Sequence, residues 1–106
     1  MPKTARLTTP RQFATVFQHK AVVSGEMFQV WYRPNRHNSS RLGIVTSKRA
    51  ARCAVDRNLV KRLIREVFRQ QRARLGNLDI VVRLRKQPTK AHAMREELLA
   101  LFPRII

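Results

Sequence analysis

Acidic side chains are scarce in this sequence. Only 6 Asp and Glu residues stand against 23 Lys and Arg residues, which leaves a formal net charge of +17 at neutral pH. Such an excess of one sign repels itself in a compact domain, and a polyanionic partner relieves the repulsion. Nucleic acid is the partner that this balance favours most, because cationic side chains release its condensed counterions. A membrane surface is the main competing partner.

Cysteine and long apolar runs are scarce as well. Cys53 is the single cysteine, so an internal disulfide is excluded and cysteine alone cannot build a zinc site. No run approaches the roughly 20 apolar residues of a membrane span, and the first residues lack the apolar stretch of a secretory signal. We therefore expect a cytoplasmic protein with no membrane partner.

The sequence also lacks the clustered carboxylates and histidines that a metal-dependent nuclease needs. The acids fall on separate predicted elements: Glu26, Asp56, Glu66, Asp79, Glu96 and Glu97. The histidines lie on three distant segments: His19, His37 and His92. Asp56 is better explained as the cap of a helix. We therefore predict neither catalytic residues nor a metal site in the protein itself, which disfavours a self-sufficient nuclease.

The apolar residues, 43% of the 106, suffice for one small core, and we expect a single domain over residues 1–106. Thr9, Pro10 and Gln12 form the pattern of a capping box at a helix start, and residues 1–8 resemble a loose tail. Apolar periodicity predicts helices over 10–20, 56–75 and 91–102, and strands over 27–33, 41–47 and 79–84. This order indicates helices packed on one sheet.

The predicted helix over 56–75 has two opposed stripes at about 100° per residue. One is apolar: Val55, Leu59, Val60, Leu63, Ile64 and Val67. The other surrounds Asn58 with cations: Arg57, Lys61, Arg62, Arg65, Arg69 and Arg72. A merely solvated face usually mixes charges at i,i+4 spacing, whereas Glu66 alone offsets this stripe. Because the arginine fork suits phosphate, the stripe predicts contact with RNA or DNA.

Two further segments extend the predicted nucleic-acid surface. Lys48, Arg49 and Arg52 precede the long helix, whose N-terminal dipole also attracts anions. A second, aromatic surface arises if the first helix packs on the strand over 27–33, and its residues are Phe13, Phe17, Gln29 and Trp31. Trp31 and Gln29 there suit an unpaired RNA strand, although pattern alone favours plain core packing for these aromatic rings.

The stretch RLGIVTSKRAARCAVDRNLVKRLIREVFR, residues 41–69, resembles the signature of the protein subunit of bacterial ribonuclease P. RLTTPRQFATVFQHK, residues 6–20, resembles the first helix of the same family. The resemblance implies an α+β fold: a two-layer α/β sandwich of order αβββαβα, ribosomal protein S5 domain 2-like, with a left-handed βαβ crossover. Handedness rules alone predict a right-handed one.

The resemblance also assigns residues by position. Lys48 and Arg49 match the basic pair after the family's strand. The family's Arg-Asn-Arg core and the basic positions after it match Arg57, Asn58, Lys61, Arg62 and Arg65. The family's cleft for the 5′ leader of precursor tRNA matches Phe13, Phe17, Gln29 and Trp31. Two residues depart from the family pattern, since Leu59 replaces the second arginine of the core and Gln29 is unusually polar.

The function that the resemblance implies is removal of the 5′ leader of precursor tRNA by a ribonucleoprotein endonuclease. Its catalytic RNA carries the chemistry and binds most of the Mg²⁺, water attacks the phosphodiester, and no protein oligomer is required. The predicted partners are therefore that RNA and precursor tRNA. The alternative from another class is a ribosomal or other structural RNA-binding protein without an enzymatic role, which the composition fits equally well.

Overall fold

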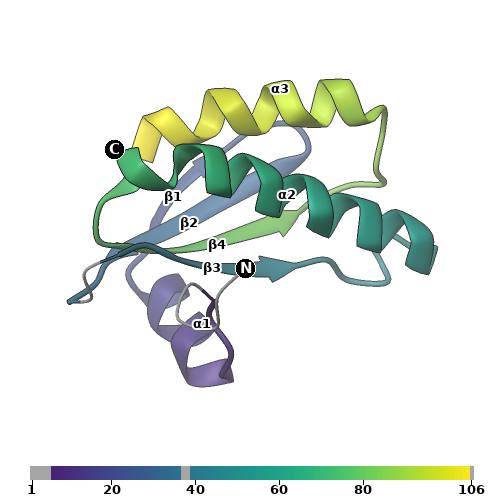
Figure 1. Cartoon of the computed structure of the whole chain (residues 1–106). Coiled ribbons are helices and arrows are strands. Elements are labelled where there is room, and N and C mark those ends of the chain that lie inside the picture. Colours follow the sequence, from purple (N-terminus) through teal and green to yellow (C-terminus); the bar gives the residue numbers. More distant parts are fainter. Residues whose placement is uncertain (1–5, 37–38, 106) are drawn as a thin grey trace.

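The computed structural model describes residues 6–36 and 39–105, which form three α-helices, one four-stranded sheet and a short 3-10 helix. The elements are α1 (Pro10–Gln18), β1 (Ala21–Ser24), β2 (Phe28–Pro34), β3 (Arg41–Val45), α2 (Ala54–Leu75), β4 (Leu78–Leu84), α3 (Ala91–Leu101) and the 3-10 helix Phe102–Ile105. The predicted α+β fold and the order αβββαβα are confirmed. Helices α2 and α3 cover one face of the sheet, and α1 lies against the other (Figure 1).

The strands lie in the order β1-β2-β4-β3. β2 pairs antiparallel with both β1 and β4, whereas β3 and β4 are parallel. A parallel pair needs a crossover connection, and α2 supplies it between β3 and β4. The left hand expected for this crossover stays a prediction.

Alternation along the strands builds two cores of different size. Phe28 and Val30 of β2, with Ile80 and Val82 of β4, face α2 and α3 in the main cluster. The intervening residues face α1, where a smaller cluster forms from Leu7, Val16 and Val81, with Phe13, Phe17, Trp31 and Val45 packed against it. The α1 face of the sheet is therefore only partly covered by apolar contacts, and polar side chains occupy the rest of it.

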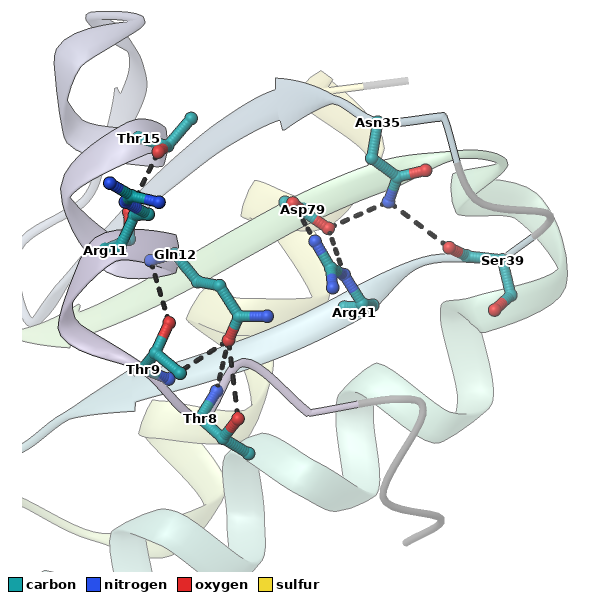
Figure 2. A network of polar contacts seen from close by, with 9 residues as sticks. All are labelled: Thr8, Thr9, Arg11, Gln12, Thr15, Asn35, Ser39, Arg41 and Asp79. Carbon is teal, nitrogen blue, oxygen red and sulfur yellow. Dashed lines mark hydrogen bonds and ion pairs between the residues drawn. The ribbon is translucent and has the colours of Figure 1, made fainter.

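Helix α1 begins as the capping box predicts. The Gln12 N–H donates to Thr9 Oγ1 at 3.2 Å, and the Thr9 N–H donates to Gln12 Oε1 at 3.0 Å (Figure 2). Its opposite end is closed by Lys20, whose φ of 61° turns the chain into β1. A Cβ at Gly43 would lie 2.5 Å from the Phe13 ring, so glycine lets α1 approach β3 closely.

A largely buried ion pair, Arg41 with Asp79, fixes the end of the sheet at which β3 and β4 begin. Asp79 accepts from Arg41 Nε at 2.8 Å and Nη2 at 2.7 Å, and from Asn35 Nδ2 at 2.8 Å (Figure 2). The hydrogen bond to Asp79 raises the pKa of Arg41 above its ordinary value, with burial acting against it. This network joins β3, β4 and the loop after β2.

One expectation at the N-terminal side of the chain is wrong, and one strand there was not predicted from the apolar pattern. The tail predicted over 1–8 is structured where it is described, because Leu7 is buried and its N–H donates to Leu42 O at 2.9 Å. Residues 1–5 lie outside the described residues. The short strand β1 has no periodicity of its own in the sequence, and only the resemblance implied a strand there.

The start of α2 also differs from the expectation. Cys53, not Asp56, occupies the cap position, and Asp56 lies in the first helical turn, where a carboxylate still stabilises the helix dipole. Val55 and Leu59 were assigned to the apolar stripe, yet they are 72% and 42% exposed. The reason is angular: at about 100° per residue, Leu59 and Val55 fall about 40° and 80° outside the arc of buried residues, beyond Leu63. Val60, in the same turn as Leu59, is fully buried.

Candidate nucleic-acid interface

The basic stripe of α2 runs along the edge of the buried face instead of opposite it. Its half-buried members are Arg57, Lys61, Arg65 and Arg72, and its exposed members are Asn58, Arg62 and Arg69. The buried residues of the helix are Val60, Leu63, Ile64, Val67, Phe68 and Leu75. The stripe thus faces both solvent and the sheet edge at β3, which places cations where a ligand can contact helix and sheet together.

Glu66 does not neutralise this stripe. Its carboxylate accepts from Arg95 Nη2 of α3 at 3.3 Å, so the one acid in the middle of α2 is directed to the neighbouring helix. Both side chains are about two-fifths exposed, which makes the pair a weak contributor to stability. The cations of the stripe therefore retain their full charge for an external anion.

Arg57 shapes the segment that precedes α2. Its Nη1 donates to Ala51 O at 2.8 Å and to Arg52 O at 3.0 Å. Ser47 stabilises a turn in the same segment, because its Oγ accepts from the Ala50 N–H at 3.1 Å. We infer that Arg57 holds the basic connection 48–52 against the helix through Nη1, and that Nε and Nη2 remain for an external anion.

Replacing Arg57 by alanine is expected to loosen residues 47–53 as well as to weaken RNA binding. Hydrogen bonds from a charged donor contribute about 1.5–3 kcal/mol, so the free energy of unfolding should fall by an amount in that range. Amide hydrogen exchange at Ala50 and Ala51 measures the local effect. The control is Arg62→Ala, because Arg62 is an exposed member of the same stripe. Equal exchange in both variants would contradict the positioning role.

The aromatic surface forms on the α1 face of the sheet. Phe17 meets Trp31 edge to face, with ring centroids 5.1 Å apart and planes at 76°. Phe13 lies over Gly43 of β3, which is separated from β2 by β4. Trp31 Nε1 is buried and has no hydrogen-bond partner in the part of the chain described. The predicted contact of α1 with β2 is confirmed for Phe17. The rings of Phe17 and Trp31 pack on the smaller core and border the part of the α1 face that apolar residues leave uncovered.

A polar hollow of about 390 Å³ continues this face toward the basic connection. It is lined by Gln29, Ser47, Arg49, Ala50, Arg83, Leu84 and Arg85. Gln29 and Arg83 are register partners on β2 and β4, and Arg83 is exposed. Arg83 and Arg85 were not among the predicted RNA-binding residues. The signal for Arg83 was present, since it lies two residues after Val81 and therefore on the same face of the strand.

A second hollow joins the aromatic surface to the basic stripe. It has a volume of about 370 Å³, and Phe13, Lys61 and Arg65 line it together with Arg6, Leu7, Thr8, Leu42, Gly43 and Ile44. The two hollows thus bring predicted residues together in two groups: Gln29 with Arg49 in one, and Phe13 with Lys61 and Arg65 in the other.

Histidine and carboxylate groups do not gather on this surface. No group of three or more His, Cys, Asp or Glu side chains that could hold a metal ion is found among residues 6–36 and 39–105. His37 lies outside the described residues. None of the described helices is long and apolar enough to cross a membrane. The cations and aromatic rings of the surface can bind anions and stack on unpaired bases.

A strongly basic α+β domain, with cations beside an aromatic ring in one hollow, defines the class of small nucleic-acid-binding proteins. A family model described as Ribonuclease P matches residues 1–105. Among curated proteins, the ribonuclease P protein component of Azoarcus sp. is 42% identical over 102 residues, covering 94% of this chain and 85% of the relative. The one from Thioalkalivibrio sulfidiphilus is 44% identical over 88 residues, covering 83% and 73%.

Solved structures agree. The Staphylococcus aureus RNase P protein superposes with a TM-score of 0.87 at 28% identity, covering 96% of this chain and 95% of that one. The Thermotoga maritima RNase P protein, solved in complex with 1-(4-fluorophenyl)-2-thiourea, gives a TM-score of 0.82 at 36% identity, covering 95% and 100%. The chain therefore belongs to the ribonuclease P protein family.

Proposed function

We propose that this chain is the protein component of ribonuclease P, and that it assists the removal of the 5′ leader from precursor tRNA. The basic stripe of α2 and the connection 48–52 bind the catalytic RNA, and the α1 face takes the leader. The observation that carries this proposal is the hollow in which Phe13, Lys61 and Arg65 meet, because it joins the two surfaces within a chain of this family.

The division of labour follows from the chemistry of the surfaces. Arginine forks bind phosphates of a folded RNA without needing its sequence, which suits the stripe. Leader recognition needs contact with an unpaired strand, and aromatic rings beside amide groups supply stacking and hydrogen bonding. Trp31 and Gln29 provide these on β2, and Arg83 adds a cation for the strand's phosphate beside them.

Catalysis is assigned to the RNA subunit. Among the described residues, the acids and histidines form no cluster fit to bind a metal ion, so we propose that Mg²⁺ is bound mainly by the RNA. Bound Mg²⁺ supplies charge stabilisation when water attacks the phosphodiester. The protein's own contribution is to hold the leader in line and to lower the repulsion between two RNAs. A cytoplasmic location stays a prediction.

Trp31 gives the most specific test of the leader site. Replacing it by alanine is expected to weaken binding of precursor tRNA to the reconstituted complex by on the order of 1–3 kcal/mol, the range for removing one base stack. Binding of mature tRNA, which has no leader, should not change. Fluorescence titration with both RNAs measures the difference.

Trp31→Phe is the matched control, because it keeps a ring beside Phe17 while removing the indole. It should retain most of the affinity for the leader. Thermal unfolding of each variant separates packing from recognition. An equal loss of affinity for precursor and mature tRNA would show that Trp31 acts only through the stability of the small core.

A further inference from the structure

The α1 face of the sheet carries a second group of cations, at the end of β2 opposite Gln29. Arg33 of β2, Asp79 of β4 and Arg41 of β3 form one row of register partners. This row faces the same side as Trp31, because both lie at alternate positions of β2. Arg33 is two residues beyond Trp31 and four beyond Gln29, roughly 7 and 13 Å along the strand at about 3.3 Å per residue.

Helix α1 lies between the two ends of this face. Phe13 packs over Gly43 of β3, Val16 contacts the cluster with Val81 of β4, and Phe17 meets Trp31 of β2. The helix thus crosses the strands over their middle row. Gln29 and Arg83 lie on one side of it, and the row that contains Arg33 lies on the other. An anion bound at Arg33 therefore occupies a different place from a leader bound at Gln29.

The charges in this row do not cancel. Both oxygens of Asp79 already accept from Arg41, and Oδ1 also accepts from Asn35. Among the described residues, no carboxylate lies within ion-pair distance of Arg33 or Arg36. Arg33 is nonetheless half-buried, whereas an arginine that merely solvates the surface is usually exposed.

These side chains surround a hollow of about 450 Å³ lined by Arg33, Pro34, Asn35, Arg36, Arg41 and Asp79. Three guanidiniums therefore surround the space with one carboxylate, which is already paired. A partly buried, uncompensated cation is unfavourable unless an anion reaches it. Planar guanidinium forks match the oxygens of a phosphate in bidentate geometry.

We propose that Arg33 and Arg36, supported by Arg41, bind a phosphodiester of RNA on the side of α1 opposite the leader cleft. Arg41 supports the site through Asp79 and keeps the loop after β2 in place by way of Asn35. The phosphodiester belongs either to the catalytic RNA or to a distal part of the leader. The proposal rests on the RNA-binding function proposed above and adds a second contact surface to it.

The test is the double variant Arg33→Gln and Arg36→Gln, compared with Arg74→Gln and Arg104→Gln. The control removes the same charge from two exposed arginines at other places. Binding is measured against salt for the catalytic RNA alone and for precursor tRNAs with short and long leaders on the reconstituted complex. The logarithmic salt slope should fall by about 0.7–0.9 for each phosphate that the variant no longer neutralises.

Weaker binding of the catalytic RNA alone assigns the site to that RNA, and weaker binding only with long leaders assigns it to the leader. Equal slopes for the double variant and the control overturn the proposal. A different result would contradict the proposed function: the wild-type protein itself would not bind these RNAs specifically. Arg36→Gln alone, at an exposed position, is the second variant if the double variant unfolds at a lower temperature.

Discussion

Replacing Asp79 by asparagine is expected to lower the free energy of unfolding by about 3–5 kcal/mol, the range for breaking a buried ion pair from one side. The side chain of Asp79 is 4% exposed, and that of its partner Arg41 is 16% exposed. The variant leaves the Arg41 charge in a partly dry site without its bidentate partner. Urea unfolding at neutral pH measures the change.

The matched control removes both charges. A double variant, Arg41→Leu with Asp79→Leu, should recover most of the stability, because replacing both partners of a buried pair by apolar residues is often close to neutral. Asn35 then loses one acceptor, which limits the recovery. A double-mutant cycle gives the coupling energy of the pair. If Asp79→Asn lowers stability by less than about 1 kcal/mol, well under the range for a buried pair, the network does not fix this end of the sheet.

Replacing Lys61, Arg62 and Arg65 together by glutamine is expected to abolish most specific binding of the catalytic RNA. Each phosphate that is no longer neutralised lowers the logarithmic salt slope by about 0.7–0.9, so three of them lower it by about 2–3. Glutamine is a good helix former and leaves α2 intact. The measurement is the dissociation constant at a series of monovalent salt concentrations.

A control of equal net charge separates the stripe from bulk electrostatics. Arg74, Lys90 and Arg104 are exposed and lie outside the stripe, so their replacement by glutamine removes three charges from other surfaces. This control should change the salt slope by much less than the stripe variant. Equal slopes in the two triple variants would mean that the overall charge of +17, and not the stripe, carries the affinity.

The helices were predictable from the sequence because their signals are local. The capping box at Thr9 and Gln12 fixed the start of α1, and periodic apolar residues gave the body of α2. The strand β1 was missed by pattern because its four residues, AVVS, alternate only between half-buried and exposed positions. Its place depends on pairing with β2, which is information that no local pattern contains.

The exposure of Leu59 illustrates a different failure. A stripe drawn through every apolar residue includes those at its edge, which need not face the core. Val55 and Leu59 lie outside the arc of buried residues, although Val60 in the same turn of α2 is fully buried. The buried face is therefore rotated relative to the predicted stripe, and it extends to Phe68 and Leu75 at its other edge.

The candidate site was predictable as a set of residues but not as a geometry. The cations of α2 were identified from their spacing, whereas the bonds from Arg57 to two carbonyls required coordinates. The same holds for Glu66, which the sequence paired with its own helix and the structure pairs with Arg95 of α3. A contact between side chains of two different helices or strands cannot be predicted from the spacing of residues along one of them.

Arg83 and Arg33 mark the limit of sequence reasoning about the sheet. Each lies at an alternate position of its strand, so each shares a face with Val81 or Trp31. Their role depends on where α1 crosses that face, and the crossing is set by the contact of Phe13 with Gly43. The packing of α1 on the sheet thus decides which cations of this face remain accessible to a ligand.

Reconstituted cleavage tests the central claim most directly. The protein is mixed with the catalytic RNA of its host and a precursor tRNA that carries a 5′ leader, at a Mg²⁺ concentration where the RNA alone is slow. The account predicts that wild-type protein accelerates leader removal, that the Lys61, Arg62 and Arg65 variant does not, and that protein without RNA cleaves nothing. Unchanged cleavage with wild-type protein, or cleavage by the protein alone, would contradict it.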